Sequence, residues 1–298
     1  MPSVPTFLKP RLENLLRSQL DDGSGRMMDF TQPAGEPALV AADSISWRVF
    51  ANPVTLVIGG ITAVLLELAE PKVRSGVWDH TTFRTDPLKR MRRTGLAAMV
   101  TVYGARSQAT RMISGVRRMH EQVRGTTPEG VPYEANDPEL LRWVHATAAF
   151  GFLEAYHHYV TPLDQAGRDR YYAEGAPISR LYGAETAPVS EDELRELFSG
   201  MLHRLEPSGI LSEFIGIMES LPLLPRPLRR FNRIFISASV GLLPPDIRMK
   251  LGLCGRSPSA AATRVLRFLA RQAEGLELDS SPIMQARRRV DDLPRNPA

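Results

Sequence analysis

The sequence has a single cysteine, Cys254, among its 298 residues. One thiol cannot form an internal disulfide, and this composition is typical of a reducing compartment. Cys254 lies in the segment Leu-Gly-Leu-Cys-Gly without a neighbouring His or Cys, which favours a structural thiol over a nucleophile. The first residues lack the basic-then-apolar order of a secretory signal. We therefore expect a soluble protein of the cytoplasm.

The chain also lacks an apolar run long enough to cross a bilayer. Its most apolar stretch is 53–66, which is closed by Glu67 and Glu70. This is shorter than the ~18 to 20 residues that a membrane span needs. We interpret it as a buried core helix. Membrane contact through this stretch is kept as a secondary interpretation, without a span.

The sequence has only a small excess of positive over negative charge. The 37 Lys and Arg residues outnumber the 33 Asp and Glu residues by four, and part of that excess falls in the run 287–289 and at Arg295. A nucleic-acid-binding surface normally shows a longer basic stripe with interleaved aromatic side chains. We therefore expect no nucleic-acid partner and interpret the basic C-terminal segment as a solvated helix end or tail.

Common catalytic and metal-binding motifs are missing. The sequence contains no His-Glu-x-x-His, no Cys-x-x-Cys, no phosphate-binding Gly-x-x-x-x-Gly-Lys-Ser/Thr and no Gly-x-Ser-x-Gly. Glu154 and His157 form one Glu-x-x-His pair, but a di-iron helical bundle needs two. These absences remove support for ordinary hydrolase and nucleotide-binding functions.

The segments that are present are helical in pattern. Apolar residues recur at spacings of three and four, and Pro and Gly fall between the periodic segments. We predict an all-α protein with one domain over 1–298, an N-terminal lead-in helix and a polar, Arg-rich end from Asp279. The predicted helices are 7–20, 53–68, 87–103, 105–123, 138–160, 164–180, 191–205, 208–221, 227–240, 245–251 and 257–274.

Arg90 and Thr94 are a first candidate pair. They are four residues apart and therefore share one face of the predicted helix 87–103. An arginine beside an apolar surface can hold an anionic group in fork geometry, and the threonine adds a hydroxyl. The alternative from spacing alone is a solvated basic face with a salt bridge.

Two histidines fall on apolar helical stripes. His120 is in register with Ala109, Ile113 and Val116, and His145 shares its face with Leu141, Ala148 and Phe152. A lone histidine in such a position is usually a hydrogen-bonded core residue. A neutral imidazole on a buried face can also bind a metal ion, so both remain candidate ligands.

Several motifs in order resemble a known family. They are Leu-Glu-Leu-Ala-Glu-Pro (66–71), Gly-Val-Trp-Asp-His (76–80), Asp-Pro-Leu-Lys-Arg-Met-Arg-Arg-Thr (86–94), Met-His-Glu-Gln-Val-Arg-Gly (119–125), Pro-Tyr-Glu-Ala-Asn-Asp-Pro (132–138) and Trp-Val-His-Ala-Thr (143–147). A weaker match covers 242–253. The chain resembles the bacterial relatives of the fungal oxygenase MpaB and of the rubber oxygenase called latex-clearing protein, over about 45–255.

The resemblance implies an all-α fold with a globin-like helical core that holds one heme b. By order and distance, His120 matches the proximal iron ligand, with His145 as second choice. Arg90 and Thr94 match an Arg/Thr pair near the heme. The expected function is a heme-dependent oxygenase that uses O₂ on a hydrophobic small molecule, isoprenoid or lipid-like. In that scheme Arg90 contacts a propionate or a polar substrate group, and Thr94 places a hydroxyl near the distal side.

The sequence departs from the family pattern at two places. Where the rubber oxygenase has a lysine that can reach the iron, this chain has Arg93, which stays protonated and cannot coordinate. The acidic residue proposed as a base in that enzyme has three candidate counterparts here, Glu67, Glu70 and Asp79. Two other functions stay open: a non-catalytic helical protein that binds heme or an apolar ligand, and a structural helical protein without a cofactor.

Overall fold

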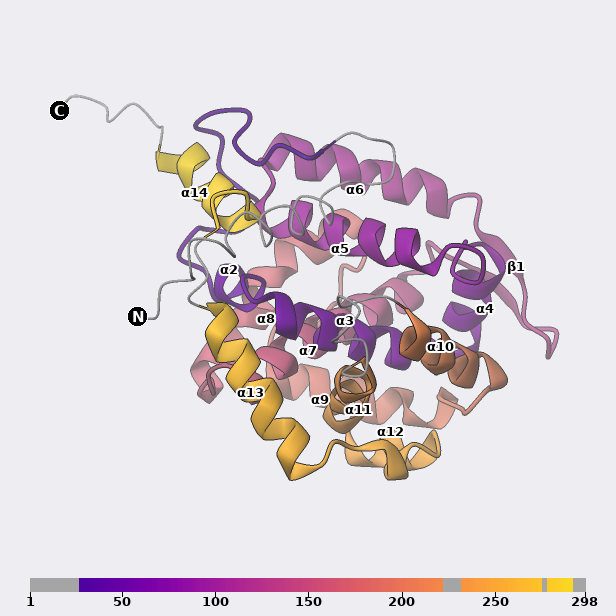
Figure 1. Cartoon of the computed structure of the whole chain (residues 1–298). Helices are drawn as coiled ribbons and strands as arrows, with labels where there is room; N and C mark the ends of the chain where they lie inside the picture. Colours follow the sequence, from indigo (N-terminus) through magenta and orange to yellow (C-terminus); the bar gives the residue numbers. More distant parts are fainter. Residues whose placement is uncertain (1–26, 222–231, 275–277, 292–298) are drawn as a thin grey trace.

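The computed structural model describes residues 27–221, 232–274 and 278–291, which form thirteen α-helices and one two-stranded sheet (Figure 1). This confirms the all-α prediction. The α-helices are α2 (Ile45–Val49), α3 (Pro53–Glu67), α4 (Pro71–Asp79), α5 (Pro87–Tyr103), α6 (Arg106–His120), α7 (Pro138–Tyr159), α8 (Gln165–Tyr182), α9 (Glu191–Met201), α10 (Gly209–Ser220), α11 (Asn232–Leu242), α12 (Pro245–Lys250), α13 (Ala260–Glu274) and α14 (Pro282–Asp291). Short 3₁₀ turns lie at Leu202–Arg204 and Cys254–Arg256. The predicted helix 7–20 lies outside the described residues.

Helix starts follow one local rule. Asn52, Glu70, Asp86 and Asp137 each cap a helix that has proline at its first position. The cap side chain accepts a hydrogen bond from a free backbone N–H of the first turn, and proline has no N–H to leave unpaired. Asp86, for example, accepts from the Lys89 N–H at 3.2 Å. The Asp-Pro starts predicted for α5 and α7 are thereby confirmed.

Helices α3 and α7 form the centre of the molecule and touch backbone to backbone. A Cβ added to Gly151 would lie 2.4 Å from the Gly59 carbonyl oxygen, and one added to Gly59 would lie 2.7 Å from the Gly151 oxygen. Only glycine at both positions permits this approach. The apolar stretch that begins at Pro53 is thus a core helix, as predicted.

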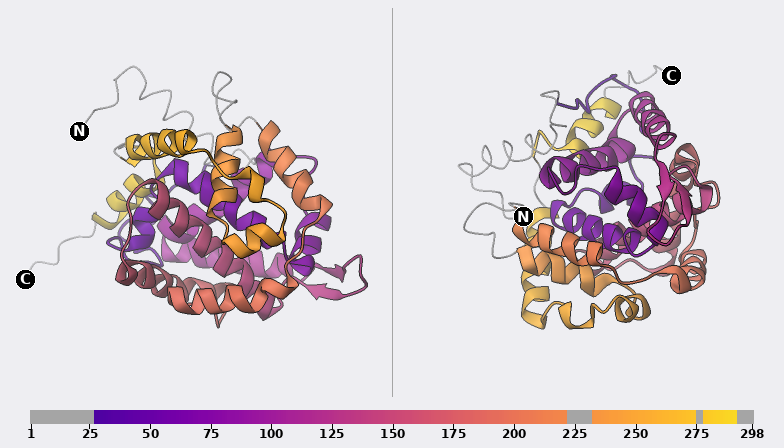
Figure 2. Two further views of the ribbon diagram at one scale, coloured as in Figure 1. Left: turned by 90° about the horizontal axis from the view of Figure 1, so that it is seen from below. Right: turned by 90° about the vertical axis from the view of Figure 1, so that its right-hand side faces the viewer.

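The other helices surround this central pair. Figure 1 and the right-hand view of Figure 2 place α5 and α6 on one side of α3, and α11, α12 and α13 on the opposite side. One apolar cluster runs through the structure and includes side chains from α2 to α14. Among the described residues no single helix is long and apolar enough to span a membrane; α3 and α4 meet the length and composition test only as a pair bent by 112°.

Three local features were not predicted. Pro71 does more than end α3. It is the first residue of a new helix, α4, which Glu70 caps. The short helix α2 starts at Ser44, whose hydroxyl accepts from the Trp47 N–H. Helix α6 ends at His120, whereas periodicity extended it to Val123, because the chain then turns into a β-strand.

The small sheet pairs β1 (Arg124–Thr126) with β2 (Pro132–Glu134) in antiparallel register. Gly125 lies directly under Tyr133, since a Cβ on Gly125 would lie 2.7 Å from the Tyr133 hydroxyl. The turn contains Gly130 at a φ of 85°. Each strand has three residues, too few for an alternating pattern to be recognised in the sequence.

The C-terminal segment differs most from expectation. We predicted a solvated helix end or tail. Residues 282–291 do form a helix, α14, on which Arg287 and Arg288 are exposed, but Arg289 is fully buried. Its guanidinium donates to three backbone carbonyls, those of Glu36 (2.8 Å), Phe30 (2.7 Å) and Tyr103 (2.8 Å). Those carbonyls accept hydrogen bonds from the buried cation and so offset the cost of its burial. The distribution of charged residues along the sequence cannot reveal such contacts.

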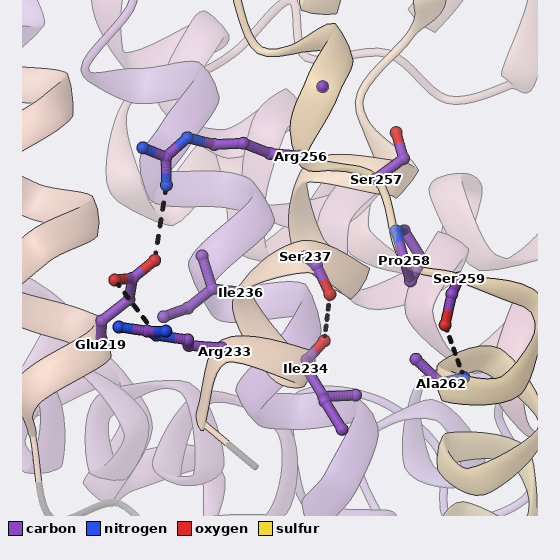
Figure 3. A pocket seen from close by; sticks show the side chains of 11 residues that line it. Glu219, Arg233, Ile234, Ile236, Ser237, Arg256, Ser257, Pro258, Ser259 and Ala262 are labelled. Carbon is purple, nitrogen blue, oxygen red and sulfur yellow. Dashed lines mark hydrogen bonds and ion pairs between the residues drawn. The ribbon is translucent and has the colours of Figure 1, made fainter. Parts of the chain in front are cut away.

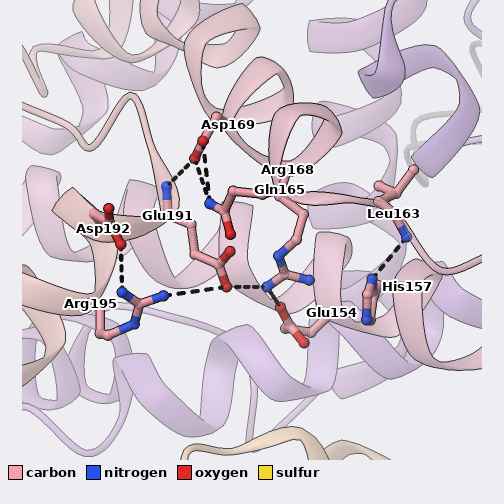
Figure 4. A network of polar contacts seen from close by, with 9 residues as sticks. All are labelled: Glu154, His157, Leu163, Gln165, Arg168, Asp169, Glu191, Asp192 and Arg195. Carbon is pink, nitrogen blue, oxygen red and sulfur yellow. Dashed lines mark hydrogen bonds and ion pairs between the residues drawn. The ribbon is translucent and has the colours of Figure 1, made fainter.

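A polar network joins α7, α8 and α9 (Figure 4). Arg168 on α8 bridges Glu154 of α7 and Glu191 of α9, the second at 2.7 Å. The neighbouring His157 uses its Nδ1 to accept from the Leu163 N–H at 3.0 Å. Glu154 and His157 are therefore both engaged in structural contacts, and no metal-binding cluster of His, Cys, Asp and Glu occurs in the described part of the chain.

The α3–α7 contact gives a direct test. Gly151→Ala should lower the free energy of unfolding by about 2 to 3 kcal/mol or more, because the new methyl group meets rigid backbone. Urea or thermal denaturation measures this loss. Gly200→Ala is the matched control: its site in α9 has nothing within 4 Å, so alanine should stabilise the protein by about 0.5 to 1 kcal/mol. Equal stability of Gly151→Ala and wild type would contradict the packing described.

Candidate functional site

Arg90 and Thr94 meet near the start of α5. The Arg90 Nη1 donates to the Thr94 Oγ1, and that hydroxyl in turn donates to the Arg90 carbonyl at 2.9 Å. The two residues therefore share one turn of the helix, as the spacing predicted. Arg90 is partly buried, whereas Thr94 is exposed.

His120 is brought to Arg90 by the way α5 and α6 follow one another. The chain turns at Gly104, and α6 packs against α5, so that the last residue of α6 lies near the first half of α5. The pKa of His120 is lowered, first by burial and then by the positive charge of Arg90. Because the charge of Arg90 acts on the His120 ring, the imidazole and the guanidinium lie in one region.

Asn136, in the segment before α7, is the second neighbour of His120. Its Nδ2 donates to the Arg117 carbonyl at 3.1 Å, which fixes the amide. Its Oδ1 is buried and has no partner at ordinary hydrogen-bond geometry, yet the side chain's contact with His120 favours the protonated ring and opposes the lowering of the His120 pKa. An acceptor in this position can hold one ring N–H and leave the other nitrogen free.

Glu67, the last residue of α3, completes the cluster. Burial raises its pKa to about 7, and the charge of Arg90 acts in the opposite direction. The other acidic candidates have other contacts. Glu70 accepts from the Val73 N–H at 2.8 Å and pairs with Arg204 at 2.8 Å. Asp79 lies where its charge acts on Tyr133.

Arg90 has no carboxylate within ion-pair distance among the described residues. Its pKa is lowered by burial, and the nearby charge of Arg93 lowers it further, while Glu67 raises it. A desolvated cation that lacks a close counter-ion is energetically costly. An anionic group of a ligand would offset that cost here.

Glu67 is desolvated and yet partly accessible. On α3 the partly accessible positions Gly60, Val64 and Glu67 follow each other at helical spacing. Helix α5 packs on α6 and makes few close backbone contacts with α3 and α7.

His145 is set apart from the cluster. Its pKa is lowered to about 4 by burial alone, without a contribution from Arg90 or Glu67. Its Nε2 faces α8, where a Cβ added to Gly175 would lie 3.7 Å away. The structure thus brings Arg90, Thr94, His120 and Glu67 together and leaves His145 on the α8 side of α7.

Two surface pockets lie elsewhere. One, of about 360 Å³, is lined by residues of α10, α11 and the start of α13, where Glu219 pairs with Arg256 at 3.4 Å and with Arg233 at 3.8 Å (Figure 3). The other, of about 380 Å³, lies between the start of α7 and α9. Neither includes Arg90, His120 or Glu67, and the charged side chains of the first are paired with one another. We therefore assign the candidate site from the convergence of side chains.

Residues 47–274 match the model of a family described as the catalytic domain of ER-bound oxygenase MpaB/B′ and rubber oxygenase. The chain belongs to this family. The match contains every residue of the cluster and extends the resemblance of 45–255 to the end of α13. This family member therefore carries an oxygenase-type catalytic domain, while α14 lies outside the match.

Two uncharacterised mycobacterial proteins, one from Mycobacterium bovis and one from Mycobacterium tuberculosis, are similar to this MpaB/rubber oxygenase family member. Each is 28% identical over 197 residues, which is 64% of this chain and 77% of the relative. No solved structure matches the chain.

The charge cluster predicts two opposite pKa changes at His120. Asn136→Ala should lower the His120 pKa further, because it removes the contact that favours the protonated ring. Arg90→Met should raise it, because it removes the largest positive charge acting on the ring. Proton NMR of the His ring resonances over a pH series measures both. If the His120 pKa is the same in wild type and both variants, the three side chains do not form one cluster.

Proposed function

We propose that this protein is a heme b-dependent oxygenase that acts with O₂ on a hydrophobic, isoprenoid- or lipid-like small molecule. The observation that carries the proposal is the convergence of His120, Arg90 and Glu67 from three different helices. Membership of an oxygenase family supports the reaction class, and the side chains support the cofactor.

His120 is the proposed iron ligand. A ligand imidazole must be unprotonated, and the lowered pKa of His120 favours that form. Proximal histidines usually donate their second ring N–H to a fixed acceptor, and the unpaired Asn136 oxygen provides one. His145, the second choice, is also neutral, but no polar side chain of the cluster contacts it.

Arg90 is the proposed partner of an anionic group, either a heme propionate or a polar end of the substrate. It is desolvated and lacks a close carboxylate, so a bidentate carboxylate would match its fork geometry. Thr94 fixes the guanidinium through its hydroxyl. In this structure the Thr94 proton is directed to the Arg90 carbonyl, so a role near the distal side of the heme requires the hydroxyl to rotate.

Glu67 is the proposed proton acceptor. With a pKa of about 7 it can take up and release a proton near neutral pH, as general acid-base catalysis requires. Arg93 is exposed, and a guanidinium offers only donors, so it serves neither as a base nor as a ligand. When bound, the heme would supply O₂ activation, while Glu67 and Arg90 would handle protons and charge.

Partly accessible apolar side chains on α3, α5 and α7 support a hydrophobic substrate. Val64 of α3, Leu88 and Met91 of α5 and Phe152 of α7 are partly accessible apolar side chains packed against the core. Apolar walls with a few polar groups at one end are typical of sites for lipid-like ligands. A second candidate function, passive binding of heme or an apolar ligand, draws support from the exposure of Thr94 and the engagement of its hydroxyl.

Heme binding through His120 is tested by absorption spectroscopy. Purified wild-type protein, reconstituted with hemin, should show a Soret band that is lost in His120→Ala with the helical circular dichroism retained. His203→Ala, on the exposed 3₁₀ turn, is the matched control and should keep the band. Loss of the band in His145→Ala but not in His120→Ala would move the ligand to α7. No heme uptake by wild type would exclude the cofactor.

Turnover separates an oxygenase from a passive binder. Thr94→Val keeps the side-chain shape and removes the hydroxyl, so O₂ uptake with detergent-dispersed squalene should fall by roughly 10- to 100-fold, as expected for the loss of a hydrogen bond that bound heme would bury. Arg90→Ala should reduce it further, Arg90→Lys should restore it only in part, and Glu67→Gln should remove its dependence on a group titrating near pH 7.

The matched control is Thr263→Val, since Thr263 also donates to the carbonyl four residues earlier, at 3.1 Å, but lies on α13. Its turnover should equal that of wild type. Retained heme content together with unchanged O₂ uptake in the Thr94, Arg90 and Glu67 variants would support the passive binder.

A further inference from the structure

Helix α13 carries an apolar ridge on its outer surface. Val265, Phe268 and Leu269 lie within one turn and have exposed fractions of 41%, 62% and 39%. Phe268 is in the middle of the outward face, since the inward face is marked by the buried Leu266 and Ala270. Exposed apolar side chains are ordinary when scattered, but a contiguous group indicates a contact surface.

The helix is fixed in this orientation. Leu266 and Ala270 pack against the core, and the Asn52 Nδ2 donates to the Ala270 carbonyl at 2.7 Å. At the end of the helix, Glu274 accepts from the Tyr156 hydroxyl at 2.9 Å. The ridge therefore cannot turn inward without breaking buried contacts.

Charge of one sign accompanies the ridge. Arg264 and Arg271 lie four residues before and three residues after Phe268, so all three share one face, and Arg267 lies at the edge of it. All three arginines are exposed, and α13 contains no acidic residue before Glu274. The surface is thus an aromatic side chain with a row of guanidinium groups along one side.

We propose that the outer face of α13 is a docking surface for an anionic lipid bilayer. Phe268, Val265 and Leu269 would enter the boundary between headgroups and acyl chains, and Arg264 and Arg271 would contact lipid phosphates. A charged amphipathic helix that lies in the plane of the interface binds membranes in this manner. Three side chains bury too little area for a stable protein interface, which favours a lipid surface over a protein partner.

This surface is independent of the proposed function. It lies on the side of the central helices away from α5 and α6, so a docked bilayer leaves those helices free (Figure 1). It also differs from the secondary interpretation made from the sequence, which placed membrane contact on 53–66, a helix whose apolar side chains are mostly buried.

Vesicle co-sedimentation of the full chain tests the proposal. The protein should bind vesicles of equal parts phosphatidylcholine and phosphatidylglycerol and bind vesicles of phosphatidylcholine alone more weakly. The double variant Arg264→Gln/Arg271→Gln should lose about 30-fold in partitioning, from about one factor of five per charge. Phe268→Gln should weaken binding to both vesicle types.

Matched controls lie on α6, on the other side of the molecule. Arg111→Gln/Arg118→Gln removes the same charge, and Met119→Gln removes an apolar side chain that is 53% exposed. Both should bind as wild type does. Equal losses in the α6 and α13 variants would mean that net charge, not the ridge, determines binding, and would overturn the proposal. So would the absence of binding to anionic vesicles.

A tryptophan reporter shows what covers the ridge. Trp47, Trp78 and Trp143 are all buried, so Phe268→Trp adds an exposed fluorophore. We expect iodide to quench it in solution and brominated acyl chains to quench it on anionic vesicles. If Trp at this position is already shielded from iodide without lipid, another part of the chain or a second copy covers the ridge, and light scattering distinguishes the two; either result overturns the proposal.

Discussion

The close approach of α3 and α7 at Gly59 and Gly151 is the constraint on which the architecture depends. Because these two helices touch through their backbones, side chains on their remaining faces are free to point outward to the helices on either side. Glu67 at the end of α3 and Phe152, next to Gly151 on α7, are placed by this contact. A larger residue at either glycine would separate the helices and displace Glu67 and Phe152.

In the candidate site, neighbouring charges and burial shift the pKa values of three side chains. The charge of Arg90 lowers the pKa of both Glu67 and His120. Burial favours the neutral form of all three side chains. The result is a neutral imidazole, a carboxyl group with a pKa near neutral pH and a guanidinium that has no carboxylate partner among the described residues. Perturbed groups gathered at one place are more typical of functional sites than of structural ion pairs such as Arg168 with Glu191.

Sequence periodicity and caps were sufficient to predict the helical class and most helix bounds, because each signal is local. Asp86 and Asp137 predict the starts of α5 and α7, and the spacing of Arg90 and Thr94 places both on one turn. Contacts between residues that are far apart in the sequence could not be predicted from these local signals. Glu67 could not be chosen over Glu70 and Asp79, Asn136 carried no signal at all, and Arg289 looked like a solvated charge, since its partners are carbonyls far away in the sequence.

The buried Arg289 has a consequence for how the protein can be divided. Its three acceptors come from the segment before α2 and from the end of α5, whereas α14 and the segment containing Phe30 and Glu36 lie outside the family match of 47–274. An expression fragment cut at the family boundaries would leave the Tyr103 carbonyl without its cation and uncover the apolar surface at the α5–α6 turn. The end of α5, the helix that carries Arg90, is thus held by segments that lie on both sides of the family match.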